Sequence, residues 1–249
     1  MIKEKRFEYI IASLKENGEI SYGTMAAELK VSEDTIRRDI DYLHQHGLLT
    51  KVRGGAIKVD KNPLSFSDRE EVQYSEKEKI GLKVQGLLKK GMTIFMDGGT
   101  TVCSIATNFP LDSAFRIITN NQALVPIISR FKDIELIVLG GVYNRDAQTN
   151  VGAQTCKDAE GFVVDIYLMG TCAISREFGI TAAIREDGAV KQAMLKGAKK
   201  VIVVSNSKKI GTNEVFRVCD LSDIDVVVTE LPKDDPQLDP IRYTDLKII

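Results

Sequence analysis

The sequence lacks an apolar run long enough to span a bilayer, and its charged first residues lack the apolar core of a signal peptide. We therefore expect a cytoplasmic protein with no membrane partner. It also lacks the amino-acid composition of fibrous or disordered chains. Hydrophobic residues make up 43% and charged residues 28% of its 249 residues, as in globular proteins. A globular chain of this length forms either one large domain or a small domain followed by a mid-sized one.

Cysteine and histidine are scarce, with four and two copies respectively. The cysteines are widely separated and form no C-x-x-C pair, which favours reduced thiols over a disulfide framework or a zinc site. We expect no metal and no cofactor. The histidines, His44 and His46, both fall near the amino end, where a polar helix end explains them better than a pH-sensitive DNA contact.

A large excess of charge of either sign is also absent, since the net charge is −1. Bulk charge therefore does not indicate a nucleic-acid partner. The distribution is more informative, because the acids of the first 60 residues fall mainly in the first half of that segment and the bases in the second. These bases, Arg37, Arg38, Lys51, Arg53 and Lys58, can form a local basic face.

Apolar spacing predicts three helices at the amino end of the chain. The first contains Phe7 to Leu14 and ends at Asn17-Gly18, a typical helix C-terminus. The second is short and begins at Ser21, a residue type that caps helix amino termini.

The third helix begins after Ser32 and runs to about His44, with Ile36, Ile40 and Leu43 on one face. Two short helices joined by a tight turn form a helix-turn-helix, whose second helix presents its amino-terminal side chains to base edges in the major groove. The residues in that position are Ser32, Thr35, Arg37 and Arg38.

A hairpin is predicted after this helix, with strands at residues 48–52 and 56–59 and a turn at Arg53-Gly54-Gly55. A hairpin in this place is a wing. Its glycines would let the backbone approach a phosphate, and Lys51, Arg53 and Lys58 would release counterions from a duplex. Arg53 and Gly54, at the tip, are the best candidates for backbone or minor-groove contact.

The same pattern also fits a three-helix domain with a hairpin that binds no DNA, so the pattern alone leaves both interpretations open. The identities of the residues are more specific than this pattern of helices and strands. VSEDTIRRDI at residues 31–40 and KVRGGA at residues 51–56 resemble the signature of the DeoR family of repressors, with Ile40 and Lys51 as the departures. The resemblance implies a DNA-binding repressor of sugar-metabolism genes, and reading of paired half-sites predicts a homo-oligomer, a dimer or tetramer.

A polar, proline-containing stretch at residues 60–74 is predicted to link two domains. It separates a winged helix-turn-helix at 1–59 from an α/β domain at 75–249. In the second domain, apolar strands alternate with helical stretches, which predicts a mainly parallel sheet covered on both faces. The predicted strands are 93–96, 116–119, 135–139, 166–169, 200–204 and 225–228, and the predicted helices are 75–90, 101–109, 121–131 and 185–198.

Polar, often glycine-containing loops follow the first four of these strands, and ligands bind at the carboxyl ends of parallel strands. In the loop Asp97-Gly98-Gly99-Thr100-Thr101, free backbone amides and two hydroxyls would bind a phosphate, and Asp97 could accept hydrogen bonds from sugar hydroxyls. Glycine turns after strands are also common without any ligand. The other three loops are Thr119-Asn120-Asn121, Gly140-Gly141 and Gly170-Thr171.

The DeoR resemblance extends through this half in the patterns D-x-G-T-T, T-N-x, L-x-G-G and K-x-G. It implies a sensor domain similar to ribose-5-phosphate isomerase, with a phosphorylated sugar or related metabolite as effector. Asn206 stands where the family usually has aspartate, and Glu230 replaces a second aspartate, so the effector itself is not defined. The implied effector-binding residues are Asp97, Gly99, Thr100, Thr101, Asn120, Gly141 and Lys209.

The sequence also allows two enzymatic alternatives to a sensor. In an isomerase-like enzyme, Asp97, Glu186, Asp187 and Lys191 would do acid and base work, but the second domain has no histidine, and Thr171-Cys172-Ala173 replaces the isomerase acid pair. In a thiol enzyme, Cys103 or Cys172 would be the nucleophile, yet neither has a histidine partner in its domain. We therefore expect a regulator and not an enzyme.

Overall fold

The structure is a computed structural model that describes residues 3–45, 48–57, 65–70, 73–242 and 246–249. The chain divides into two compact units, residues 1–64 and residues 65–249. Within the described ranges, no helix is both long and apolar enough to cross a membrane.

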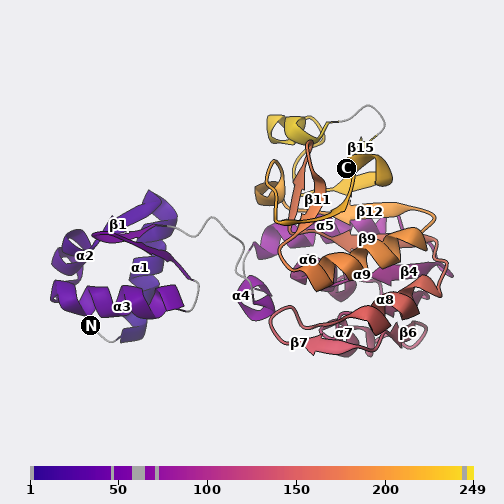
Figure 1. Ribbon diagram of the computed structural model, residues 1–249, viewed down its shortest axis with the longest axis horizontal. Coiled ribbons are helices and arrows are strands. Elements are labelled where there is room, and N and C mark those ends of the chain that lie inside the picture. The colour runs from indigo at the N-terminus through magenta and orange to yellow at the C-terminus, as the bar shows by residue number, and fades with distance from the viewer. Residues whose placement is uncertain (1–2, 46–47, 58–64, 71–72, 243–245) are drawn as a thin grey trace. The chain divides into compact units, whose positions relative to one another are not determined.

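The first unit is a winged helix-turn-helix (Figure 1). Its core holds Ile10 and Leu14 of α1 with Ile36, Ile40 and Leu43 of α3, all nearly inaccessible to solvent. The wing strands join a short first strand in an antiparallel sheet of order β1-β3-β2. The elements are α1 (Lys3–Asn17), β1 (Glu19–Ser21), α2 (Tyr22–Leu29), α3 (Glu33–Gln45), β2 (Thr50–Val52) and β3 (Gly55–Ile57).

The predicted helix caps are confirmed. The Ser21 hydroxyl accepts a hydrogen bond from the Thr24 amide at 3.1 Å, and the Ser32 hydroxyl accepts one from the Thr35 amide at 3.2 Å. Gly18 ends α1 with φ of +77°. Local sequence therefore determines where these helices begin and end.

The role predicted for Gly55 is wrong. We placed it in the wing turn, but it lies in β3, buried and paired with Ser21 of β1. A Cβ at Gly55 would lie 1.9 Å from the Ile20 carbonyl oxygen, so glycine is required for β1 to pack here. Gly54, exposed and with φ of +92°, forms the turn. Lys58 lies outside the described residues.

A buried ion pair ties α1 to α3. Arg6 Nε donates to Asp39 Oδ2 at 2.6 Å, and a second guanidinium nitrogen donates to Oδ1 at 3.1 Å. The Asp39 side chain is 4% exposed. Because a buried carboxylate needs such a partner, Asp39 is an architectural residue of the recognition helix.

The second unit contains a seven-stranded sheet in which all neighbouring strands are parallel, in the order β15-β14-β12-β9-β4-β5-β6. The predicted fold class is thus confirmed. The strands β4 and β5 begin and end as predicted, and the four other predicted strands, β6, β9, β12 and β14, differ by one residue at one end. The edge strand β15 was not predicted. Their bounds are β4 (Thr93–Met96), β5 (Arg116–Thr119), β6 (Glu135–Val138), β9 (Ile166–Gly170), β12 (Val201–Val204), β14 (Val226–Val228) and β15 (Lys247–Ile248).

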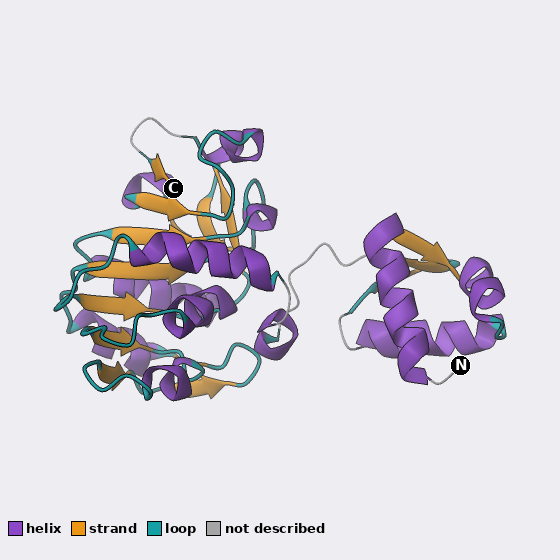
Figure 2. Cartoon of the chain, turned by 180° about the vertical axis from the view of Figure 1, so that it is seen from behind, coloured by secondary structure: helices purple, strands orange, loops and turns teal. Residues whose placement is uncertain are grey.

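Helices cover both faces of this sheet (Figure 2). One core cluster includes residues of α5, α6 and α7, and the other includes residues of α8 and α9. Phe95 belongs to one cluster and its neighbours Ile94 and Met96 to the other, as expected for a strand buried on both sides. The helices are α5 (Tyr74–Gln85), α6 (Thr100–Thr107), α7 (Leu124–Ile128), α8 (Ala153–Glu160) and α9 (Arg185–Lys196).

Several short elements were not predicted. They are too short, or too mixed in polarity, for a clear period. They comprise β1, α8, β15, α4 (Phe66–Glu70), the hairpin β7 (Val142–Asn144) with β8 (Thr149–Val151), the antiparallel sheet of β10 (Ala173–Ser175), β11 (Gly179–Ala182) and β13 (Phe216–Cys219), and the 3-10 turns η1 (Ser207–Lys209), η2 (Leu221–Asp223) and η3 (Pro236–Ile241).

The strand order reverses between β4 and β9. From β4 the chain moves outward through β5 to β6, then returns to β9 on the other side of β4. At such a switch point the loops diverge in opposite directions and leave a crevice at the carboxyl ends of the two strands. This crevice is where a ligand is expected.

Replacing Gly55 with alanine should destabilise the first unit by about 3 kcal/mol, because the new Cβ would clash with the backbone of β1. Gly54→Ala is the matched control. It meets open space and should cost about 1 kcal/mol from its positive φ alone. Urea unfolding followed by hydrogen exchange of α1–α3 amides would measure both, and equal losses would contradict the assignment.

Candidate DNA-binding surface and effector site

The exposed side of α3 carries the predicted base-reading residues. Arg37 and Arg38 are exposed and Thr35 is half-buried, whereas Ile36 is fully buried on the opposite side. Arg38 is paired with Asp34 at 2.7 Å, but both side chains are mostly exposed. Such a surface pair holds its members weakly, so Arg38 is free to turn toward another anion.

Ser32 has a clear structural role. Its hydroxyl contacts the Thr35 hydroxyl at 2.9 Å as well as the Thr35 amide. The cap thereby fixes Thr35 at the start of the helix. A direct DNA contact by Ser32 stays a prediction.

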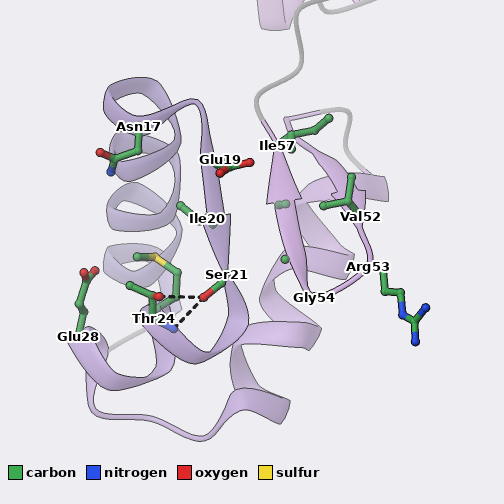
Figure 3. A pocket seen from close by; sticks show the side chains of 13 residues that line it. Asn17, Glu19, Ile20, Ser21, Thr24, Glu28, Val52, Arg53, Gly54 and Ile57 are labelled. Atoms are coloured by element: carbon green, nitrogen blue, oxygen red, sulfur yellow. Dashed lines mark hydrogen bonds between the residues drawn. The ribbon is translucent and has the colours of Figure 1, made fainter.

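The wing presents Lys51, Arg53 and Gly54 to solvent. Lys51 Nζ forms an ion pair with Asp41 of α3, and this bond raises the pKa of Lys51. Arg53 extends away from the sheet (Figure 3). The hollow drawn in the same figure has Glu19 and Glu28 in its lining, and these carboxylates would repel a DNA phosphate.

In the second unit, Asp97 joins the two strands at the switch point. It directly follows β4, and its Oδ1 accepts a hydrogen bond from the Gly170 amide of β9 at 2.7 Å. Its Oδ2 accepts bonds from the Tyr167 hydroxyl at 2.5 Å and from Lys191 Nζ at 2.6 Å. Lys191, on α9, also lies 3.6 Å from Asp187. Asp97 and Lys191 are 1% and 3% exposed.

Asp97 and Lys191 stabilise each other's charged form. Burial alone would lower the pKa of Lys191, but the carboxylates of Asp187 and Asp97 more than offset it and raise that pKa. Burial raises the pKa of Asp97, and the Lys191 ammonium opposes the rise. Since three protein donors occupy its carboxylate, Asp97 acts here as an architectural residue. The predicted contact of Asp97 with sugar hydroxyls is untested, and the three hydrogen bonds to protein donors make it less favourable.

The loop after Asp97 leads into α6. Gly99, with φ of +132°, precedes the helix and supplies no side-chain cap, and a Cβ there would meet nothing within 4 Å. Thr100 and Thr101 are buried in the first turn. Gly98 packs closely, since a Cβ there would lie 2.6 Å from Thr149. An uncapped helix amino terminus of this kind suits an anion.

Three buried polar atoms near the strand ends have no partner within the described residues: Asn120 Oδ1, Thr149 Oγ1 and Asn206 Oδ1. The amide nitrogens of the two asparagines are bonded, Asn120 to the Asn150 carbonyl at 2.8 Å and Asn206 to Gln73 Oε1 at 2.7 Å. Each unpaired acceptor costs free energy, so a ligand or water that donates a hydrogen bond is expected.

Gly141 has a packing role. A Cβ on this residue would lie 2.0 Å from Thr155 Oγ1 of α8, and its φ is +141°.

The Glu230 carboxylate, at a position where the family usually has aspartate, accepts hydrogen bonds from the Ser207 amide at 3.0 Å and from the Thr229 hydroxyl at 2.8 Å. Burial would raise the pKa of Glu230, but these bonds outweigh it and lower the pKa.

Lys209 lies at the strand ends together with two cations that the sequence did not single out as site residues, Arg69 of α4 and Lys77 of α5. Lys209 Nζ donates to the Thr171 carbonyl at 2.5 Å, directly after β9. Lys77 Nζ donates to the carbonyls of Arg69 and Glu70, and Arg69 Nε to the Ser65 carbonyl at 3.2 Å. In the described part of the chain, none of the three is ion paired with a carboxylate.

These cations act on one another. Burial and the positive charge of Arg69 lower the pKa of Lys77 to about 8. Burial and the charges of Arg69, Lys191 and Lys77 lower the pKa of Lys209 to about 8 as well. Cations that destabilise each other in this way favour an anion among them.

The cysteines differ in their surroundings. Burial raises the pKa of Cys103 to about 12, which removes its thiolate at neutral pH. Cys172 is half-buried and follows Thr171 at the strand ends. All four cysteines are free thiols.

Replacing Asp97 with alanine should destabilise the second unit by about 3–5 kcal/mol, because Lys191 would remain buried without its closest partner. The matched control is Asp112→Ala, which removes an exposed partner of Lys90 and should change stability little. Chemical denaturation of both variants would test this. A stable Asp97→Ala protein would show that the carboxylate is not needed for the fold.

Comparison with known proteins agrees with this arrangement. A family described as DeoR-like helix-turn-helix domain matches residues 6–62, and one described as DeoR C terminal sensor domain matches residues 72–231. The HTH-type transcriptional repressor GlcR of Bacillus subtilis is 32% identical over 92% of this chain and 89% of its own length. The glycerol-3-phosphate regulon repressor of Escherichia coli (strain K12) is 28% identical over 93% and 92%.

Solved structures with similar coordinates include the sorbitol operon regulator SorC from Klebsiella pneumoniae, with 15% identity over 83% of this chain and 96% of that chain and a TM-score of 0.36. Ribose 5-phosphate isomerase A from Methanocaldococcus jannaschii has 14% identity over 54% and 53%, with a TM-score of 0.40. The two curated relatives are named as repressors, in agreement with the prediction of a regulator and not an enzyme. The chain belongs to the DeoR family, with a DeoR-like helix-turn-helix domain followed by a DeoR sensor domain.

Proposed function

We propose that the chain is a cytoplasmic transcription repressor of sugar-metabolism genes, and that a phosphorylated sugar or related metabolite changes its affinity for operator DNA. The single observation that carries the effector is the group of three cations, Arg69, Lys77 and Lys209, without carboxylate partners among the described residues. A phosphate dianion would supply the missing negative charge.

Groups beside these cations indicate what else the effector would carry. The uncapped start of α6, with Gly99, Thr100 and Thr101, would add backbone donors for the same phosphate. The unpaired oxygens of Asn120 and Asn206 would accept hydrogen bonds from hydroxyls. An anion joined to several hydroxyls is the chemistry of a sugar phosphate.

Regulation would then follow from linkage. An effector that binds the DNA-incompetent state more tightly lowers operator affinity by that difference in binding free energy. Reading of two half-sites by two copies of the helix-turn-helix would make the active form a homo-oligomer.

Arg38→Ala should weaken binding to an operator duplex about tenfold or more and leave effector binding unchanged, because Arg38 is exposed on α3 and remote in sequence from the sensor residues. The duplex would be one that the wild-type chain selects from a random pool. Arg130→Ala, an exposed arginine of the second unit, is the control. Equal loss of DNA and effector binding would contradict separate sites.

Inorganic phosphate and a panel of pentose and hexose phosphates should raise the thermal midpoint of the chain at pH 7. The shift should shrink as pH rises through about 8, where Lys77 and Lys209 lose their charge, and not near 10.5 as for ordinary lysines. Lys209→Met should abolish the shift, and Lys90→Met, at an exposed site, should not. A full shift in Lys209→Met would overturn the assignment, and turnover of any sugar phosphate would overturn the sensor function.

A further inference from the structure

Tyr22 lies where the helix-turn-helix meets the wing. It is the first residue of α2, directly after the cap Ser21, and only 7% of it is exposed. Its backbone amide donates to the carbonyl of Gly54, in the wing turn, at 2.9 Å. The position of Tyr22 is therefore fixed by the core on one side and by the wing on the other.

The ring of Tyr22 supports Arg37. The guanidinium carbon of Arg37, on α3, lies 5.4 Å from the centre of the ring. A guanidinium over an aromatic face is attracted electrostatically by the ring, and the attraction is smaller at an exposed site than at one shielded from water. Arg37 forms no ion pair in the described part of the chain, so the ring is the group that orients it.

The neighbouring arginine is held differently. Arg38 contacts the carboxylate of Asp34, and both side chains are mostly exposed. This pair is weak and depends on salt concentration. Arg37 therefore contacts a ring that the fold holds in place, whereas Arg38 contacts an exposed carboxylate of its own helix that a phosphate can replace.

We propose that Tyr22 is a positioning residue for sequence recognition, which fixes the Arg37 guanidinium relative to the wing turn. One residue contacts both DNA-binding elements, the turn through its backbone and the recognition helix through its ring. An arginine held in one direction loses little conformational entropy on binding, and this favours a base edge with matching acceptors over other bases. The inference rests on the proposed DNA-binding function.

The hydroxyl of Tyr22 is not needed for this role. It is buried and has no hydrogen-bond partner within the described residues. Burial of an unpaired hydroxyl destabilises the folded state, so its removal should not lower stability. Tyr22→Phe therefore keeps the ring under Arg37 while Tyr22→Leu removes it, which gives a conservative and a disruptive variant at one position.

The test uses the full chain, a duplex selected by the wild type from a random pool, and a scrambled duplex of the same composition. The readout is the ratio of the two affinities, because a general loss of folded protein cancels in it. Tyr22→Leu should lower this ratio about two- to fivefold. Tyr22→Phe should keep the wild-type ratio with an equal or higher thermal midpoint.

Double-mutant cycles separate positioning from a structural effect. In an Arg37→Ala background, Tyr22→Leu should have no further effect on the ratio. In an Arg38→Ala background, it should have its full effect. Equal additivity in both backgrounds, or equal loss on both duplexes, would overturn the proposal. A wild-type chain that selects no duplex would instead overturn the DNA-binding function itself.

Discussion

The carboxylate of Asp97 accepts hydrogen bonds from Tyr167, Gly170 and Lys191, and these bonds hold β4 to β9 where the strand order reverses. The chain leaves β4 in one direction and returns to β9 from the other, so no short connection fixes the two strand ends. The loop that leads to α6 begins at Asp97, and the Thr171 carbonyl that receives Lys209 directly follows β9. The geometry of the whole candidate effector site therefore depends on this buried cluster.

In this chain, buried charged side chains that pair with each other stabilise the fold, whereas charged side chains outside ion pairs are the candidates for ligand binding. Asp97 with Lys191 and Asp39 with Arg6 are buried pairs whose members are satisfied by each other. Among the described residues, Lys77 and Lys209 hydrogen bond to carbonyl oxygens and form no ion pair, and the pKa of each falls to about 8. Because burying a charge without its counter-charge is unfavourable, these two lysines are where an anionic ligand is expected under the proposed function. Arg37 is different, because it is exposed and its contact among the described residues is the ring of Tyr22, so its charge remains available to DNA.

Local patterns in the sequence predicted the helix caps Ser21 and Ser32, the sheet strands and the loops that follow them, because each depends on neighbours within a few residues. Contacts between distant segments could not be predicted in the same way. Gly55 looked like a turn residue, but β1 packs against it. Arg69 was assigned to the linker and Lys77 to a lysine-rich helix, and only the fold brings them near Lys209. Asp97 was identified as a site residue, but its three protein partners lie seventy or more positions away.

The pairing of β4 with β9 also bears on the order in which the molecule forms. Asp97 and Gly170 are 73 positions apart, so the chain must close a long loop before this cluster can form. The first unit has only 64 residues, and its buried ion pair joins Arg6 and Asp39, which are 33 positions apart. Domains with local contacts fold faster, and amino-terminal segments leave the ribosome first. Under the proposed function, a nascent chain would complete its DNA-binding unit before its sensor, so control by a metabolite would begin only once the second unit has folded.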